Sequence, residues 1–312
     1  MHWKNRRIAQ ITIASAIIGF PRAGLTADYP APTSIRFHLY RDYLIVVPAR
    51  VNGTGPYDFL VDTGCSSTTI DPELDRQLGA PQAGAADVAL LSGVRRNRKV
   101  VLNEISIGAA EATSFPVLVD KLDSEHALVR GVRGILGEDF LKAFDLLIDY
   151  DRRTITFNDP VPEGERLAFA DTGEVNGRHT FNRLMMEVAF PGAGGRHAVL
   201  QLDTAAWVME LFPSSHVGLP SVGFRGNQQG RLSDLKNKYV RTTLRIGGGD
   251  FRNVTVAVSR NGSDSDAVGL LPASMFATIY ISHSGKFVIL NPHSHRLEAR
   301  HNALELAALS GP

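Results

Sequence analysis

Apolar residues occur along this chain in short runs that are separated by glycine-rich turns. The run Leu44–Val51 leads into the turn Asn52–Gly55, and a second apolar run follows at Tyr57–Val61. A similar pair comes later, at Leu184–Phe190 and His197–Leu202, around a turn that contains three glycines. Short apolar runs joined by glycine turns are typical of β-hairpins. The pattern therefore predicts one such hairpin in each half of the chain.

The chain repeats this order of elements once, over a period far longer than that of a solenoid repeat. Each hairpin is followed by an aspartate, Asp62 or Asp203, and a proline suited to the first turn of a helix comes ten residues later. Each copy then closes with a glycine and two aliphatic residues, at Gly134–Leu136 and at Gly269–Leu271. We therefore expect two similar lobes.

Helical signals are brief in both copies. Asp71 can cap a helix that begins at Pro72, and Gly79 can end it. Each copy ends in a further hairpin pattern, at Leu146–Phe157 and at Thr278–Leu290. Short strands, glycine turns and few helices predict a mainly β fold with short helices.

The boundaries of the lobes follow from breaks in this pattern. Prolines and a glycine interrupt it at 158–164, so we expect an N-terminal lobe at residues 28–160 and a C-terminal lobe at 161–292. Residues 293–312 are polar and then helical in tendency, and we expect them to form a peripheral tail.

The first 27 residues have the composition of a secretory signal. Lys4, Arg6 and Arg7 precede the apolar stretch Ile8–Phe20, whose 13 residues are fewer than a bilayer-spanning helix needs. We expect cleavage near Ala27 and export to the periplasm or the medium, with an uncleaved N-terminal anchor as the alternative. No later segment is apolar over a span long enough to cross a membrane, so we expect no stable membrane span after cleavage.

Composition narrows the possible partners. The net charge is only +1, so no global field favours nucleic acid, and we expect no nucleic-acid partner. Cys65 is the single cysteine, which rules out a disulfide within the chain. Four histidines near the C-terminus lack the spacing of metal ligands, and we interpret them as surface residues and expect no metal. They are His283, His293, His295 and His301.

Two segments carry candidate chemistry, Tyr57–Ser67 with the triplet Asp62-Thr63-Gly64, and Gly134–Phe140. Together they resemble the active-site loop and the second signature of retropepsin-like aspartic peptidases. The weaker second copy around Asp203 extends the resemblance to pepsin-like members and to residues 37–292. The resemblance implies two acid-protease-like β lobes related by a pseudo-twofold axis, a substrate cleft between them, and hydrolysis of peptide bonds.

The chemistry of such a site rests on a pair of carboxyl groups. Two carboxyl groups a few ångströms apart cannot both ionise cheaply, so one is charged while the other holds a proton. The charged group takes a proton from water while the other donates one to the peptide carbonyl, and no metal or cofactor is required. The expected catalytic pair is Asp62 and Asp203. The residues expected to support their loops are Thr63, Gly64, Ser66, Thr204 and Ala205.

The second copy departs from the pattern at Ala205 and Pro272, where the first copy has glycine. Three interpretations follow. The first, which we favour, is a monomeric peptidase that cleaves peptides or proteins with an intramolecular pair of aspartates. The second is a homodimeric retropepsin that uses only Asp62. The third is a non-catalytic protein with a degenerate second lobe that binds peptides or a partner in the cell envelope.

Two further segments need an interpretation. Leu90–Val101 is expected to form the flap hairpin over the substrate, with Leu91, Ser92 and Gly93 at its tip. We interpret its basic residues as a solvated hairpin edge. The triplet Asp171–Gly173 has the same sequence as the triplet at Asp62. No matching second signature follows it, so we expect a surface turn there.

Overall fold

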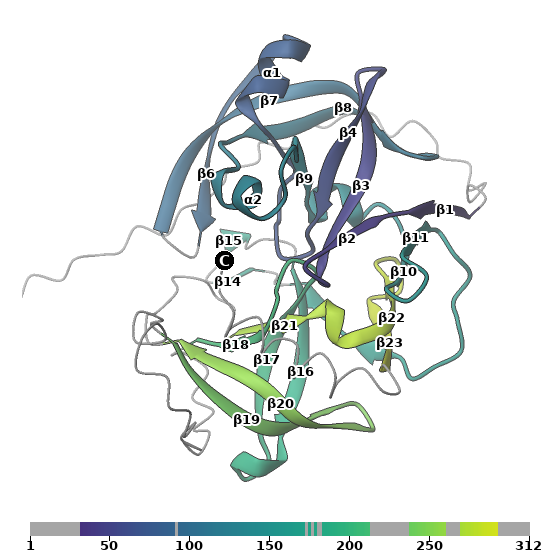
Figure 1. Cartoon of the computed structure of the whole chain (residues 1–312), viewed down its shortest axis with the longest axis vertical. Helices are drawn as coiled ribbons and strands as arrows, with labels where there is room; N and C mark the ends of the chain where they lie inside the picture. The colour runs from purple at the N-terminus through teal and green to yellow at the C-terminus, as the bar shows by residue number, and fades with distance from the viewer. Residues whose placement is uncertain are drawn as a thin grey trace, which may run out of the picture.

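The protein is described here from a computed structural model, and most of the described residues lie in β-strands (Figure 1). The structure describes residues 32–90, 93–171, 174–175, 178–179, 183–212, 237–259 and 269–292. The predicted signal segment and the predicted C-terminal tail lie outside these residues. The described helices are all too short to cross a bilayer. The prediction of a mainly β fold is confirmed.

The first half of the chain, up to Phe157, forms an eight-stranded sheet in the order β2-β3-β4-β9-β5-β8-β7-β6. Its strands are His38–Tyr40 (β2), Leu44–Val51 (β3), Thr54–Val61 (β4), Thr69–Ile70 (β5), Gln82–Leu90 (β6), Gly93–Ile107 (β7), Ala110–Val119 (β8) and Gly134–Leu136 (β9). The predicted first hairpin is β3–β4, in which Val46 lies opposite Leu60. Strand β4 pairs in parallel with β9, so Val61 lies beside Leu136 of the second signature.

The second half, from Leu167 onward, forms a seven-stranded sheet in the order β13-β16-β17-β21-β18-β20-β19. Its strands are Ala170–Asp171 (β13), Leu184–Phe190 (β16), Arg196–Asp203 (β17), Met209–Leu211 (β18), Asn237–Ile246 (β19), Gly249–Ser259 (β20) and Gly269–Pro272 (β21). All seven strands of this sheet follow the order of the first seven in the other sheet, and corresponding pairs run in the same relative direction. The internal repeat read from the sequence is therefore present in the strand order.

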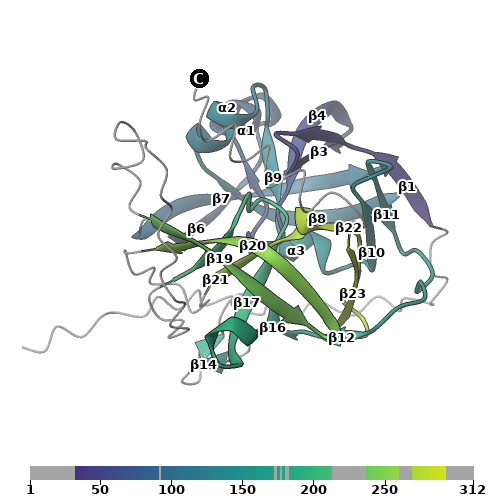
Figure 2. The ribbon, with the colours of Figure 1, turned by 60° about the horizontal axis from the view of Figure 1, so that its bottom comes forward.

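A third sheet of six strands combines both halves, in the order β1-β11-β10-β22-β23-β12 (Figures 1 and 2). Its strands are Thr33–Arg36 (β1), Leu146–Asp149 (β10), Thr154–Phe157 (β11), Leu167–Ala168 (β12), Phe276–Ser282 (β22) and Phe287–Pro292 (β23). The two predicted terminal hairpins are β10–β11 and β22–β23, and they meet where Leu146 lies opposite Ile281. We call this the shared sheet.

The remaining elements are short. The helices are Pro72–Leu78 (α1), Asp123–Leu128 (α2) and Glu138–Leu141 (α3), and Pro191–Ala193 (η1) and Ala273–Met275 (η4) form 3₁₀ turns. A separate two-stranded pair consists of Glu174–Val175 (β14) and Arg178–His179 (β15). As predicted, the Asp71 side chain accepts a hydrogen bond from Leu74 N at 2.6 Å, and Gly79 ends α1 with φ of 57°. Pro213, expected to begin the matching helix, lies outside the described residues.

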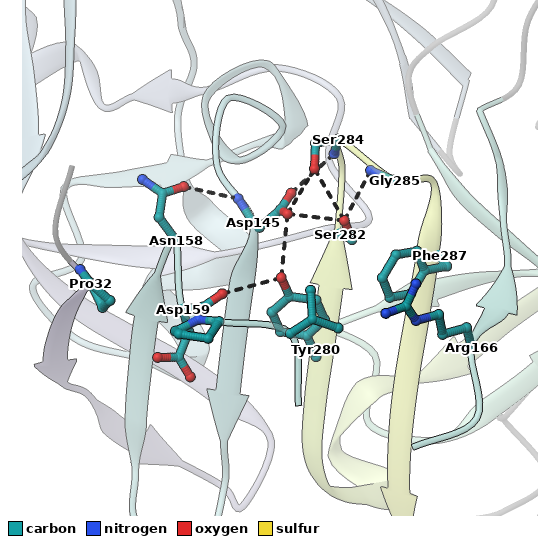
Figure 3. Close-up of a pocket in the computed structure, with 12 residues that line it drawn as sticks. Pro32, Asp145, Asn158, Asp159, Arg166, Tyr280, Ser282, Ser284, Gly285 and Phe287 are labelled. Atoms are coloured by element: carbon teal, nitrogen blue, oxygen red, sulfur yellow. Dashed lines mark hydrogen bonds between the residues drawn. The ribbon is translucent and has the colours of Figure 1, made fainter. Parts of the chain in front are cut away.

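A pocket of about 490 Å³ opens beside the shared sheet (Figure 3). At its edge the Asp145 carboxylate accepts hydrogen bonds from the hydroxyls of Ser282 at 3.0 Å and Ser284 at 2.9 Å. The polar groups of Asp145 therefore join the start of β10 to the β22–β23 turn. Neither Asp62 nor Asp203 lines this pocket, so we assign its polar network to the packing of the shared sheet.

His283 does not lie on the surface, contrary to the expectation from sequence. The residue is only 6% exposed. Its Nε2 lies 3.0 Å from Glu138 Oε2, and its Nδ1 lies 2.7 Å from the backbone oxygen of Phe144. Pairing in the shared sheet brings the end of β22 against α3, where oxygen atoms satisfy both ring nitrogens. A buried polar pair thus joins the two halves through Glu138, a residue of the second signature.

This pair predicts a large effect of one substitution on stability. In His283→Ala the Glu138 carboxylate stays buried without its partner, so we expect the free energy of unfolding to fall by about 3–5 kcal/mol. Urea denaturation followed by circular dichroism measures the change. His197→Ala is the control, because that histidine also pairs with a glutamate, Glu187, but both side chains are exposed. It should cost less than about 1 kcal/mol. Equal effects of the two substitutions would contradict the assignment.

Candidate active site

Asp62 and Asp203 occupy equivalent places in their two sheets. Asp62 directly follows β4, and its backbone N–H donates to the oxygen of Leu136 in β9 at 3.0 Å. Asp203 is the last residue of β17 and lies beside Pro272 of β21. Both aspartates therefore begin a loop at a point where a buried strand is fixed by a parallel neighbour.

The two carboxyl groups converge on Gly64. A Cβ atom placed on this glycine would lie 2.4 Å from Asp203 Oδ2 and 2.9 Å from Asp62 Oδ1. Because both distances start from the same point, the separation of the two carboxyl oxygens cannot exceed their sum. Any side chain at position 64 would collide with the carboxyl group of Asp203, so this close approach requires glycine.

Thr63 and Thr204 join the two aspartate loops by reciprocal hydrogen bonds. The N–H of Thr63 donates to Thr204 Oγ1 at 3.0 Å, and the N–H of Thr204 donates to Thr63 Oγ1 at 3.1 Å. Each hydroxyl then donates to a strand carbonyl of the other half, to Leu202 at 2.8 Å and to Val61 at 2.7 Å. Both threonines are buried. Four buried hydrogen bonds thus connect residues that are 139 to 143 positions apart. We call these bonds the threonine bridge.

The backbone donors of the two carboxyl groups differ in strength. Asp62 Oδ1 accepts from the N–H of Gly64 at 2.8 Å, and the N–H of Cys65 makes a smaller contribution. Asp203 Oδ1 accepts from the N–H of Ala205 at 2.7 Å and from that of Ala206 at 3.0 Å. Hydrogen bonds to a carboxylate favour its ionised form. The environment of Asp203 therefore favours the charged form more than that of Asp62 does.

Neighbouring charges reinforce this difference. Burial raises the pKa of Asp62 well above its usual range, and the charges of Asp203 and then Glu125 raise it further. Burial also raises the pKa of Asp203, but the N–H groups of its loop and the positive charge of Arg183 lower it in part. The loop donors and the nearby charges therefore both favour the ionised form of Asp203 over that of Asp62.

The second signature supports the loop that follows the first aspartate. Asp139 Oδ1 accepts from the N–H of Thr68 at 2.8 Å, from its hydroxyl at 2.7 Å, and from the N–H of Phe140 at 2.9 Å. The N–H of Gly137 donates to Thr68 Oγ1 at 3.2 Å, and a Cβ on this glycine would lie 2.6 Å from the backbone of Ser67. Loop and signature therefore form one closely packed unit.

The other residues proposed from the sequence lie in or near this unit. Ser66 is half-buried on the loop after Asp62. Ala205 packs against an apolar cluster of the first half, which contains Leu44, Val46 and Leu60. The Cys65 thiol donates to the oxygen of Ser67 at 3.2 Å, and burial raises its pKa, so the thiol stays protonated. No grouping of three or more potential metal-ligating side chains occurs in the described part of the chain.

The flap hairpin is described only in part. Strands β6 and β7 pair in antiparallel register up to Leu90 opposite Gly93. Leu91 and Ser92, which were expected at its tip, lie outside the described residues. A hairpin with arms Gln82–Leu90 and Gly93–Ile107 therefore flanks the expected tip, and it begins earlier in the chain than the expected segment Leu90–Val101. Its closure over a substrate stays a prediction. Asp171 of the repeated triplet ends β13, and the rest of that triplet also lies outside the described residues.

Sequence reasoning missed several residues around the pair. Asp139 supports the first loop, and Glu125 and Arg183 act on the aspartates by charge. Gln201 reaches from β17 to the loop of the other half. Two of these had a visible signal. Asp139 lies within the second signature, and Gln201 is a polar residue inside an otherwise apolar strand end, which is unusual for a buried position.

Comparison with known proteins gives one family match. Residues 47–140 match the family model for aspartyl proteases. The resemblance to retropepsin-like aspartic peptidases is thus confirmed over this segment. The matched residues, 47–140, contain the Asp62 loop and the second signature, whereas Asp203 lies beyond them.

The solved structures and the curated proteins add little to this match. A retropepsin-like aspartic protease from Rickettsia conorii is 22% identical, with 40% of this chain and 90% of that chain covered and a TM-score of 0.31. A score this low does not establish a common fold. No curated protein matches the chain.

The environment of Asp139 predicts a specific dependence of stability on pH. Burial raises the pKa of Asp139 from 3.8 to about 6, with hydrogen bonds from Thr68 lowering it in part. A raised pKa in the folded state means that stability is fully present below the unfolded value and is lost as pH rises through about 6. Relative to Asp139→Asn, the wild type should therefore lose roughly 2–4 kcal/mol of unfolding free energy between about pH 4 and pH 8.

Asp139→Asn isolates this effect, because its Oδ1 can accept all three of the hydrogen bonds described above. Urea denaturation of both proteins across this pH range measures the difference, and the pH dependence of the aspartate pair cancels in the comparison. A difference that stays constant with pH would show that Asp139 does not titrate as described.

Proposed function

We propose that this protein is an aspartic endopeptidase that hydrolyses peptide bonds with a water molecule activated between Asp62 and Asp203. The observation that carries the proposal is the convergence of the two carboxyl groups on Gly64, within loops that the threonine bridge joins. The aspartyl protease match over residues 47–140 supports the same reaction class.

The difference between the two carboxyl groups assigns their roles. Asp203, which accepts two backbone hydrogen bonds, is the ionised member and accepts a proton from the water as its oxygen attacks the peptide carbonyl carbon. Asp62 holds the proton and donates it to the carbonyl oxygen, which gives a neutral tetrahedral intermediate. The proton on Asp203 then passes to the leaving nitrogen, the C–N bond breaks, and Asp62 recovers its proton from the collapsing hydroxyl group.

The threonine bridge favours an intramolecular pair over a homodimer that uses only Asp62. The partners of Thr63 are the hydroxyl of Thr204 and the carbonyl of Leu202, both in the same chain. A second copy that brought its own Asp62 loop to this place would have to break these buried hydrogen bonds. The proposed enzyme is therefore a monomer that acts on peptide or protein substrates without a metal or cofactor.

The proposed domain organisation and location rest on sequence patterns. We propose lobes at residues 28–160 and 161–292, which agrees with the separate sheets of the two halves. The basic start and the apolar stretch of the first 27 residues support export to the periplasm or the medium.

Separate substitutions of the two aspartates test the proposal. Asp62→Asn and Asp203→Asn should each lower kcat for peptide cleavage by at least about 100-fold, because each removes one partner of the proton transfers. Cleavage of a broad peptide library, read by mass spectrometry, measures activity. Asp171→Asn is the matched control, since it changes the aspartate of the repeated triplet, and it should retain full activity.

The outcomes separate the three interpretations. Loss in both variants supports the intramolecular pair. Loss only in Asp62→Asn would favour a homodimer that uses a single aspartate from each chain. A wild-type protein that cleaves no peptide in the library would favour a non-catalytic binding protein.

A further inference from the structure

Gln201 is a buried polar residue in the strand that leads to Asp203. It lies on β17 between Leu200 and Leu202, and only 3% of its surface is exposed. Its Nε2 donates to the backbone oxygen of Gly64 at 3.1 Å and to that of Thr63 at 3.3 Å. An amide of the second half thus binds the aspartate loop of the first half.

One of these hydrogen bonds leads directly to the carboxyl group of Asp62. The carbonyl of Thr63 and the N–H of Gly64 belong to the same peptide group, and this N–H donates to Asp62 Oδ1 at 2.8 Å. A donor on the carbonyl of a peptide group polarises it and strengthens its N–H as a donor. The Gln201 amide therefore acts on Asp62 through a single intervening peptide group.

The equivalent position of the first half has an apolar residue. Leu60 lies two residues before Asp62, as Gln201 lies two residues before Asp203, and it is buried in the apolar cluster against which Ala205 packs. The loop after Asp203 therefore meets apolar side chains. Gly64, the counterpart of Ala205, cannot make such a contact, because a side chain there would collide with the carboxyl group of Asp203.

This difference matches the different supply of backbone donors. Asp203 accepts two backbone hydrogen bonds through Oδ1, whereas Asp62 Oδ1 accepts the one from Gly64. The stronger backbone donor of Asp62, the N–H of Gly64, belongs to the peptide group that Gln201 polarises. Gln201 thus reinforces the carboxyl group that has the weaker backbone support.

We propose that Gln201 is a positioning residue for Asp62, which it orients across the two halves through the Thr63–Gly64 peptide group. This inference rests on the proposed function for its catalytic consequence, but the contact itself can be tested without any activity. The action of Gln201 on the Asp62 carboxyl group requires no movement of either aspartate loop.

The test substitutes Gln201 by methionine, which has a similar length and no donor. The proteins carry ¹³C-labelled aspartate, and the carboxyl resonances of the pair are assigned with Asp62→Asn and Asp203→Asn. Gln201→Met removes the donor to the Thr63 carbonyl, which weakens the N–H of Gly64 as a donor to Asp62. The ionised form of Asp62 is then less favoured, so the pKa of Asp62 should rise by roughly 0.3–1. Val199→Met, on the same strand but at an exposed position, should leave the titration unchanged.

A second variant and a second measurement make the outcome decisive. Gln201→Leu copies the residue that the first half has at this position, and it replaces Gln201→Met if the latter does not fold. In peptide cleavage kcat should fall by roughly 3–10-fold with little change in KM, because substrate contacts are untouched. An unchanged Asp62 titration in a folded variant would overturn the proposal. A wild type that cleaves no peptide would overturn the proposed function alone, since the titration still decides the role of Gln201.

Discussion

The close approach of two buried carboxyl groups is the constraint on which the rest of this structure depends. Burial and mutual repulsion both oppose their ionisation, so the fold must hold them together against a free-energy cost. The threonine bridge supplies this restraint, because it fixes the two loops to each other and to the strand ends behind them. The close approach also requires glycine at position 64, because a side chain there would collide with the carboxyl group of Asp203.

The two halves share a strand order but complete their aspartate loops differently. In the first half the loop is fixed by Asp139, which accepts three hydrogen bonds, and by the amide of Gln201 from the other half. In the second half the loop folds back on its own aspartate through two N–H groups and places the methyl of Ala205 against apolar residues. Different loops on the same framework place the two carboxyl groups in different environments, as the acid and base roles proposed for them require.

Local patterns were sufficient to predict the strands, one helix and the residues that meet at the site. The strands Leu44–Val51 and Leu184–Phe190 and the caps of α1 lie where the sequence indicated, since apolar runs, glycine turns and helix caps act over a few residues. The shared sheet and the burial of His283 could not be read in this way. Both depend on pairing between β10 and β22, whose partners are far apart in the chain. The same limit hid Gln201, whose role lies in a hydrogen bond to the other half.

One departure of the second copy from the glycine pattern is accompanied by the loss of the corresponding hydrogen-bond partner. In the first half the N–H of Gly137 donates to the hydroxyl of Thr68. The equivalent positions are Pro272, which has no N–H, and Met209, which has no hydroxyl. Losing only one member of such a pair would leave a buried polar group without a partner, at a cost of about 1–3 kcal/mol. Because donor and acceptor are absent together, the proline at position 272 is no evidence that the second loop has decayed. Ala205 is likewise no evidence of decay, since its N–H still donates to Asp203 while its methyl packs against the first half.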